Sequence, residues 1–420
     1  MQVEVSALGA VIGLIISIIL IFKKTPPIYS LLIGALAGGL IGGATLVQTV
    51  ELMIGGAQGM MTAILRILAA GVLAGVLIES GAAESIARTI IHTLGETRAL
   101  FALALAAMLL TAVGVFIDIA VITVAPIALI VAKNANISKT AILLAMIGCG
   151  KAGNVMSPNP NTIAVSEAFQ SPLTSVMLAG VLPGIAALFI TYFFAKRLSQ
   201  KGAFIKEEEL EKTEVDKDLP TFIKALSGPI IAVLLLSLRP AAGIVIDPII
   251  ALPVGGIIGS ITMGKYKDLL HQANFGLSKM SSVAILLIGT GTIAGIITNS
   301  TLGAVLIEGI TSLGLPVYLL APISGIVMSA ATASTTSGSI VASSVFSAPL
   351  LESGISALAG AAMIHAGATV LDHLPHGSFF HATGGSVLMN FKDRLKLIPY
   401  ESMIGLTITI VSVILFGILG

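Results

Sequence analysis

The sequence Gly148-Cys149-Gly150-Lys151-Ala152-Gly153-Asn154-Val155-Met156-Ser157-Pro158-Asn159-Pro160-Asn161-Thr162 interrupts a strongly hydrophobic part of the chain. Its glycines loosen the backbone, and its two prolines remove helical hydrogen-bond donors and disfavour helix at the residues before them. Broken, polar backbone at membrane depth is tolerated only where it is buried in protein or lines a wet cavity. The stretch therefore predicts a discontinuous helix at a substrate site. An ordinary polar loop between two spans is the alternative.

Composition indicates a polytopic membrane protein. Hydrophobic residues make up 56% of the chain and charged residues 10%, and the mean hydropathy is +1.04. Soluble domains carry about 25% charged residues. A span needs about 20 residues, so 420 residues allow about fourteen spans with short loops. The net charge of +1, without a basic patch, gives no indication of nucleic-acid binding. The single Cys149 excludes an internal disulfide and a cysteine metal cluster.

The chain is predicted to contain two related halves. Pro27-Ile28 matches Pro248-Ile249, which lie 248 − 27 = 221 residues later, and Pro158 falls on Pro375, 375 − 158 = 217 residues later. We expect three parts: a first transmembrane repeat at 1–195, a hydrophilic linker at 196–225 and a second transmembrane repeat at 226–420. The apolar N-terminus, without a basic segment before it, is expected to be a retained first span.

The Lys and Arg residues predict the orientation of these halves. If Lys23 and Lys24 are cytoplasmic and the chain crosses at each predicted span, nearly all of the 22 Lys and Arg residues fall on the cytoplasmic side. The prediction is an all-α polytopic protein with an inverted repeat of two seven-span halves containing discontinuous helices or re-entrant hairpins. The linker is then cytoplasmic and both termini lie outside. Inverted repeats with breaks at the midplane are typical of secondary transporters.

Several segments carry specific expectations. The polar gap with Gln48 and Glu51 is expected to separate two spans, and 79–98 to be a polar connector with an interfacial helix. The run at 118–132 is short for a full crossing and is expected to be a re-entrant hairpin arm. The segment 176–195 is expected to be an uninterrupted span.

A Ser/Thr-rich insertion occurs in the second half. Residues 331–339 carry six hydroxyls in nine residues inside an apolar region. Such hydroxyls can donate hydrogen bonds to a carboxylate or to sugar hydroxyls, so the segment is a candidate site. Close helix packing by small residues is the alternative.

A His-rich insertion follows at 365–381 and holds four of the six histidines. Histidine titrates near neutral pH, and an intramembrane carboxylate can be shifted to titrate there too. Asp372, His373 and His376 are therefore candidates for a proton relay, and polar packing at the edge of a cavity is the alternative. No second pair of ligands suggests a metal site.

Four ionisable residues are expected inside the helix bundle, where such groups are costly and usually functional. They are Asp118, Lys151, Glu167 and Asp372. Lys151 could pair with an anionic substrate or, equally, with Asp118 or Asp372. Arg66 is expected to extend its charged end toward the membrane surface.

At its helix breaks and polar insertions the chain resembles the gluconate permease (GntP) family of proton-coupled symporters, within the ion-transporter superfamily. The resemblance covers nearly the whole chain and is most specific at Gly153–Thr162 and at 372–380. It implies import of gluconate, related sugar acids or small hydroxy acids with protons. It also implies hairpins entering from opposite faces, a dimerising scaffold and an elevator-like motion. The chain departs from the gluconate carriers at Ser157-Pro158-Asn159-Pro160 and at 374–378.

The leading hypothesis is a proton-coupled importer of a small organic anion in a bacterial inner membrane, acting as a homodimer without a cofactor or enzymatic activity. The residues expected to contact substrate are Lys151, Asn154, Ser157, Asn159, Asn161, Thr162, Thr335, Thr336, Ser337 and Ser378. Those expected to carry the proton are Asp118, Asp372, His373 and His376. Sodium-coupled uptake or cation/proton exchange is the alternative. An intramembrane enzyme and a passive channel are disfavoured.

Overall fold

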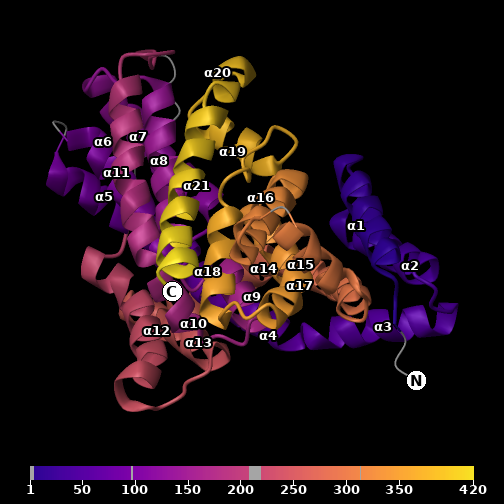
Figure 1. Cartoon of the computed structure of the whole chain (residues 1–420). Helices are drawn as coiled ribbons and strands as arrows, with labels where there is room; N and C mark the ends of the chain where they lie inside the picture. Colours follow the sequence, from indigo (N-terminus) through magenta and orange to yellow (C-terminus); the bar gives the residue numbers. More distant parts are fainter. Residues whose placement is uncertain (1–3, 96–97, 208–218, 313) are drawn as a thin grey trace.

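The computed structural model describes residues 4–95, 98–207, 219–312 and 314–420, and these residues fold as helices (Figure 1). An isolated parallel bridge joins Val5 to Ser300. Within the described residues, five helical segments are long and apolar enough to cross a membrane: Met61–Glu79, Ile117–Asn134, Leu173–Leu198, Tyr266–Thr298 and Phe391–Ile418. Shorter apolar helices accompany them. The prediction of an all-α, multi-pass membrane protein is confirmed.

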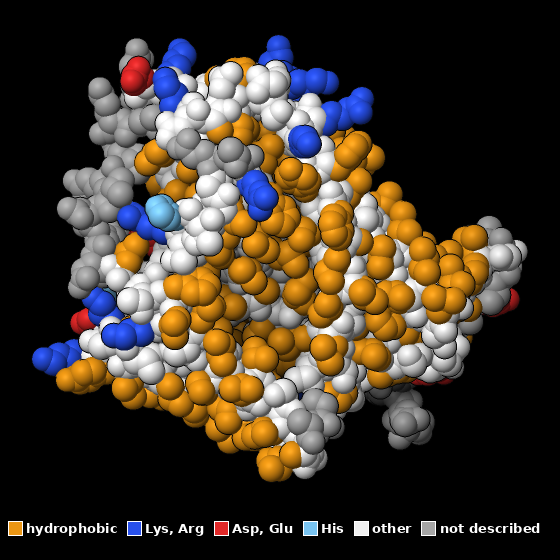
Figure 2. Space-filling view, turned by 90° about the vertical axis from the view of Figure 1, so that its left-hand side faces the viewer, with side chains coloured by type: hydrophobic (Ala, Val, Ile, Leu, Met, Phe, Trp, Pro, Cys, Tyr) orange, Lys and Arg blue, Asp and Glu red, His pale blue; other side chains and the backbone are white. Residues whose placement is uncertain are grey.

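The surface shown in Figure 2 fits this assignment. Hydrophobic side chains cover the middle of the face, and blue Lys and Arg side chains gather at its upper end and along one edge. Large apolar side chains such as Phe189 and Ile230 are exposed. A broad apolar belt of this kind suits contact with lipid tails, since helices satisfy their own backbone groups there.

One set of helices, here named the frame group, packs together through α14 and α4. It consists of α1 (Ala7–Phe22), α2 (Pro27–Ile41), α3 (Leu46–Gly59), α4 (Met61–Glu79), α12 (Phe222–Ala242), α13 (Pro248–Thr262) and α14 (Leu269–Thr298). In Figure 1, α3 runs along the lower edge toward α1 and α2, whereas α12 and α13 lie below the opposite side. A Cβ atom built on Gly75 would lie 2.0 Å from the Gln272 carbonyl oxygen, so α4 and α14 are in backbone contact.

The remaining helices, here named the hairpin group, contain two helical hairpins and two broken helices. Its members are α5 (Ala82–Leu94), α6 (Ala99–Ala112), α7 (Ile117–Asn134), α8 (Lys139–Asn154), α9 (Pro160–Ala168), α10 (Leu173–Ala179), α11 (Val181–Leu198), α15 (Leu302–Ser312), α16 (Leu320–Thr332), α17 (Thr335–Glu352), α18 (Ala357–Gly367), α19 (Ser378–Ser386), α20 (Phe391–Leu395) and α21 (Ile398–Val413). Shorter elements in the described part of the chain include η3 (Tyr266–Asp268), η4 (Val317–Leu319) and η5 (Ile414–Ile418). The hairpins are α6–α7 and α16–α17, and each packs on a broken helix, α8 or α18.

Both predicted helix breaks are present. In the first half, α8 ends at Asn154 and α9 starts at Pro160, where a missing N–H costs no helical hydrogen bond. Asn159 caps α9, because its side chain accepts from the backbone N–H groups of Asn161 and Thr162. In the second half, α18 ends at Gly367 and α19 starts at Ser378. The Ser/Thr-rich insertion is also interrupted, at Ala333 and Ser334 between α16 and α17.

Three further expectations concern the connecting segments. The polar gap with Gln48 and Glu51 lies in helix α3, because Thr45 and Gln48 form a capping box that starts it. The segment at 176–195 lies within the candidate span Leu173–Leu198, in which α10 is followed by α11 at Gly180. The connector at 79–98 contains a helix as expected, α5, whose apolar face packs on α6 and α12.

The lengths of several helices do not confirm two seven-span halves. The second parts of both broken helices, α9 and α19, contain 9 residues each, and α10 contains 7. These are too short to cross a hydrocarbon core alone, which takes about 20 residues. By contrast, α7, expected to be a short arm, has 18 residues. Residues 208–218 of the predicted linker lie outside the described residues.

Candidate substrate cavity and buried charge network

A cavity of about 520 Å³ lies where both hairpin tips meet α2 and α14 of the frame group. The residues that line it are Pro27, Ile28, Phe116, Asp118, Ile119, Lys279, Ser282, Val283, Ile285, Leu286, Ser334, Thr336 and Ser337. The cavity therefore joins the start of α7 in the first half to the start of α17 in the second. Its size and its mixture of apolar walls with a few polar groups are typical of a small-molecule site.

The start of α17 presents neutral hydrogen-bond donors to this cavity. Ser334 caps the helix, since its Oγ accepts from the Ser337 backbone N–H at 3.2 Å. The hydroxyls of Thr336 and Ser337 make no hydrogen bond within the described part of the chain. A helix start also carries partial positive charge, which favours an anion. Two of the expected substrate residues, Thr336 and Ser337, are thus placed together on the cavity wall.

Two ionisable side chains line the cavity, Asp118 from the first turn of α7 and Lys279 from α14. They make no direct ion pair with each other within the described residues, although Lys279 lies near enough to attract the Asp118 carboxyl electrostatically. The Lys279 ammonium lies 5.1 Å from the centroid of the Phe275 ring. Sequence reasoning missed Lys279 because it counted this lysine with a cytoplasmic loop, whereas α14 begins ten residues earlier, at Leu269.

A buried cluster of charges connects the two broken helices. Lys151 Nζ, on α8, donates to Asp372 Oδ1 at 2.5 Å and to the Thr369 carbonyl oxygen at 2.7 Å. His373 Nδ1 lies 3.0 Å from the same ammonium and 2.9 Å from Asp372 Oδ1. The three side chains are at most 3% exposed. Of the alternatives for Lys151, the structure therefore shows the ion pair with Asp372.

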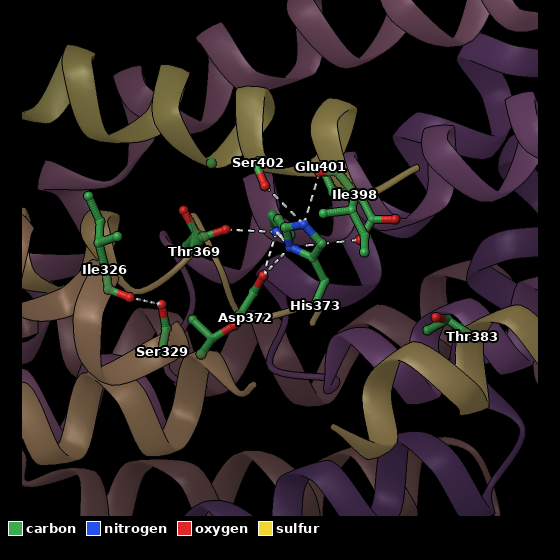
Figure 3. A network of polar contacts seen from close by, with 12 residues as sticks. Ile326, Ser329, Thr369, Asp372, His373, Thr383, Ile398, Glu401 and Ser402 are labelled. Atoms are coloured by element: carbon green, nitrogen blue, oxygen red, sulfur yellow. Dashed lines mark hydrogen bonds and ion pairs between the residues drawn. The ribbon is translucent and has the colours of Figure 1, made fainter. Parts of the chain in front are cut away.

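The cluster extends from His373 to α21 and α20. Figure 3 shows Glu401 and Ser402 pointing toward the His373 ring from the side opposite Asp372. His373 Nε2 lies 3.1 Å from the Ile398 carbonyl oxygen and 3.2 Å from Ser402 Oγ. Glu401 in turn pairs with Arg394, and both side chains are at most 1% exposed.

His373 Nδ1 faces both a donor and an acceptor. The Lys151 ammonium can only donate to it, whereas Asp372 Oδ1, when ionised, can only accept from it. The ring therefore lies between the two charges of the ion pair. One Lys and one Arg balance one Asp and one Glu, so these four side chains together carry no net charge when ionised.

Thr335 links this network to the cavity. Its Oγ1 donates to Asp372 Oδ2 at 2.5 Å, and its neighbours Ser334 and Thr336 line the cavity. Lys151 and Thr335, both expected to contact substrate, therefore contact Asp372 instead.

The polar residues of the first break bond mainly to one another. Asn159 Nδ2 donates to the Asn154 carbonyl oxygen at 2.7 Å, to Asn154 Oδ1 at 2.6 Å and to Ser157 Oγ at 2.7 Å. Asn159 Oδ1 accepts from the Thr162 hydroxyl at 3.3 Å. All five expected substrate residues of this break are buried and none lines the cavity. Asn154 Nδ2 and Asn161 Oδ1 are buried without a hydrogen-bond partner in the described structure.

The other expected residues lie at the second break. His376 is exposed, and its Nε2 lies 3.3 Å from the Ala331 carbonyl oxygen of α16. Ser378 is the exposed first residue of α19. Within the described residues, no group of three or more His, Cys, Asp or Glu side chains is placed to hold a metal ion.

Arg66 has two acidic partners. It forms ion pairs with Glu167 of α9 and, at 2.5 Å, with Asp247 at the start of α13. Arg66 and Glu167 line a second cavity of about 200 Å³. These ion pairs join the frame group to the first broken helix.

Sequence reasoning missed Arg394 and Glu401 as buried residues. In the sequence, Arg394 lies between Lys392 and Lys396 and looks like part of a charged loop. The structure places its guanidinium 4.7 Å from the centroid of the Phe380 ring and beside Thr383 of α19. No signal in the sequence separated it from its exposed neighbours.

A cavity at the hairpin tips, beside buried charges in a bundle of apolar helices, is typical of membrane transporters. The sequence model described as GntP family permease matches residues 4–419, so the chain belongs to the GntP permease family. The chain is 64% identical over 414 residues to an uncharacterized transporter of Haemophilus influenzae, covering 99% of each chain. It is 24% identical to a high-affinity gluconate transporter of Escherichia coli, covering 95% of this chain and 96% of that one.

A solved structure supports the fold. The YdaH transporter of Alcanivorax borkumensis aligns with a TM-score of 0.64 at 16% identity, covering 88% of this chain and 87% of that one. At this identity the likeness concerns the fold alone.

Proposed function

We propose that this permease imports a small organic anion together with a proton, with the anion held in the cavity between the two hairpin tips. The observation that carries the proposal is the hydrogen bond from Thr335 to Asp372. It connects the helix start that lines the cavity with a buried ion pair. The Thr335 side chain thereby links a substrate bound at the start of α17 to a carboxylate that can take up a proton.

Charge balance gives the proton its role. An anion moved alone through a low-dielectric site carries a large desolvation cost. A proton taken up by Asp372 or His373 cancels the charge of the anion. Protonation of Asp372 also removes the counter-ion of Lys151, so the positive charge of the ammonium is left to attract the anion's carboxylate. Lys151, Asp372 and His373 are therefore proposed to act as one proton-binding unit.

The positions of the helices support the proposed two-repeat organisation at 1–195 and 226–420. The first connector α5 begins at Ala82 and α15 begins at Leu302, a shift of 302 − 82 = 220. The second part of the first broken helix begins at Pro160 and its counterpart at Ser378, a shift of 378 − 160 = 218. We propose that the second repeat is inverted, with the 196–225 linker in the cytoplasm, both termini outside, and the protein a homodimer of the inner membrane.

Transport into proteoliposomes tests the proposal. Gluconate, glycerate, 3-hydroxybutyrate, lactate and citrate would each be offered with an inward proton gradient, an inward sodium gradient or neither. Accumulation driven by the proton gradient alone is expected for at least one hydroxy acid. Accumulation that requires sodium would contradict the coupling ion and the proposed role of His373. No uptake of any acid, with proton release on adding sodium, would favour an exchanger.

Sodium coupling is the second candidate because of one observation in the first break. Asn161 Oδ1 is a buried oxygen without a hydrogen-bond partner in the described structure. Hard cations take oxygen ligands, and this amide lies among other hydroxyl and amide oxygens. An Asn161→Ala variant that loses a sodium requirement while keeping substrate binding would support this reading.

A further inference from the structure

An open groove of about 470 Å³, here named the α11 groove, lies where α11 ends. It is lined by residues from the start of α6, from the turn between α7 and α8 and from the last turns of α11. Figure 1 shows α6 and α11 side by side at one edge of the molecule, and the two helices are in contact. None of its described lining residues lines the cavity at the hairpin tips, so the α11 groove is a separate feature.

The α11 groove carries two cations without an acidic neighbour. Arg98 and Lys196 line it, are exposed, and make no side-chain hydrogen bond or ion pair within the described residues. Among the described residues that line the groove, none is Asp or Glu. The Tyr192 hydroxyl, also at the groove, has no hydrogen-bond partner in the described part of the chain. A guanidinium, an ammonium and a hydroxyl together suit an anion with several acceptor oxygens, such as a phosphate.

An exposed apolar stripe on α11 leads to these cations. Leu182, Ile185, Phe189 and Phe193 are exposed and follow one another at three- and four-residue spacing, on the helix face that ends in Lys196. From Ile185 to Lys196 the chain advances 196 − 185 = 11 residues, or about 16 Å along the helix axis. One leaflet provides about half of a hydrocarbon core about 30 Å thick. A lipid whose acyl chain packs on this stripe therefore has its headgroup at the α11 groove.

Two aromatic rings form the apolar side of the α11 groove. The ring centroids of Phe101 and Tyr192 lie 5.8 Å apart in an edge-to-face arrangement, and both residues line the groove. Tyrosine is enriched at the depth of lipid headgroups, because its ring is apolar and its hydroxyl is polar. The groove thus changes from apolar to cationic in the same direction as a lipid changes from chain to headgroup.

We propose that the α11 groove binds an anionic phospholipid, with the phosphate between Arg98 and Lys196 and an acyl chain along the apolar stripe. A zwitterionic lipid is disfavoured because its headgroup brings a cation toward two cations. A soluble phosphate ester is disfavoured because it lacks the chain that would cover the stripe. The site does not depend on the proposed transport function.

Lipid binding to the purified full-length protein tests this inference. The probes are phosphatidylglycerol and phosphatidylcholine with the same acyl chains, and native mass spectrometry measures how much of each lipid the protein retains in a titration. For the wild type we expect phosphatidylglycerol to bind about tenfold more tightly than phosphatidylcholine. For Arg98→Gln combined with Lys196→Gln we expect phosphatidylglycerol affinity to fall by about tenfold and phosphatidylcholine affinity to stay unchanged. Glycerol phosphate at the concentration of the lipid should not displace it.

A matched control removes two cations from the same end of α11. Arg197 and Lys201 are exposed, and neither lines the α11 groove. Arg197→Gln combined with Lys201→Gln changes the net charge equally, and we expect phosphatidylglycerol affinity within about twofold of the wild type. Both double variants should keep the Tm of the wild type, because all four side chains are exposed.

Four results would overturn the inference. Equal loss of phosphatidylglycerol affinity in the two double variants would assign binding to the charge of this end of the molecule as a whole. Equal affinity of the wild type for the two lipids would remove the role of the cations, and displacement by glycerol phosphate would remove the role of the stripe. A wild type that retains neither lipid would indicate another occupant, such as the acid-rich linker segment at 207–218.

Discussion

Thr335 Oγ1 lies 2.5 Å from Asp372 Oδ2, and this contact joins the tip of the second hairpin to the second helix break. Thr335 is buried while its neighbours Thr336 and Ser337 face the cavity. The contact therefore places a carboxylate of the buried network directly behind the wall that is proposed to receive the substrate.

Replacement of Thr335 by Val is expected to weaken the coupling of transport to the proton gradient more than it weakens substrate binding. Val keeps the shape of the side chain but leaves Asp372 with one hydrogen bond fewer, which raises the free energy of its ionised form. The measurement is the ratio of proton-driven accumulation to substrate exchange without a gradient. Thr335→Ser keeps the hydroxyl and is the control. Equal loss of accumulation and exchange in Thr335→Val would contradict this assignment.

Asp372→Asn is expected to abolish proton-driven accumulation and to destabilise the protein. It leaves the fully buried Lys151 ammonium without its counter-ion, and breaking a buried pair costs about 3–5 kcal/mol. Thermal unfolding in detergent would show a lowered Tm. The double variant Lys151→Met with Asp372→Asn removes the unpaired charge, so it should regain most of the Tm without regaining accumulation. A double variant that accumulates substrate normally would exclude the pair from coupling.

Asn159→Ala is expected to loosen the first break. The Asn159 side chain caps α9 and bonds to Asn154 and Ser157. Loss of the cap alone costs about 1 kcal/mol. Because Asn159 does not line the cavity, substrate affinity should fall through disorder of the break, together with a lower Tm. A weaker affinity at unchanged Tm would instead indicate direct contact with substrate.

Arg66→Ala is expected to destabilise the junction between the frame group and α9. Two carboxylates, Glu167 and Asp247, would lose their shared cationic partner and repel each other. The three side chains are partly exposed, so the loss should be modest, about 1 kcal/mol. Glu167→Gln retains the Asp247 pair and should lose less. The comparison of Tm values for the two variants checks this order, and an equal loss would contradict it.

The helix breaks could be predicted because their cause is local. Pro158 and Pro160 lack N–H groups wherever the chain folds, and the break at 155–159 follows from that chemistry. The start of α3 was missed although its cause is also local, because the capping box of Thr45 and Gln48 was read as a polar gap.

The site could be predicted only in part because its contacts join distant parts of the chain. Sequence reasoning identified Lys151, Asp372 and His373 separately, but the pairing of Lys151 across 221 residues depends on how α8 packs. In the sequence, Lys279 and Arg394 look like charged loop residues. In the structure, Lys279 lies within the long helix α14, and Arg394 is buried beside Phe380.

The cavity's position between two helix groups has a consequence for how occupancy can be detected. Asp118 and Lys279 belong to separate helix groups, so a molecule that contacts both residues links the two groups. A relative movement of the groups would break one of the two contacts, so the bound molecule favours the arrangement in which both contacts form. The bound form should therefore resist unfolding, and above saturation the Tm should keep rising with the logarithm of ligand concentration.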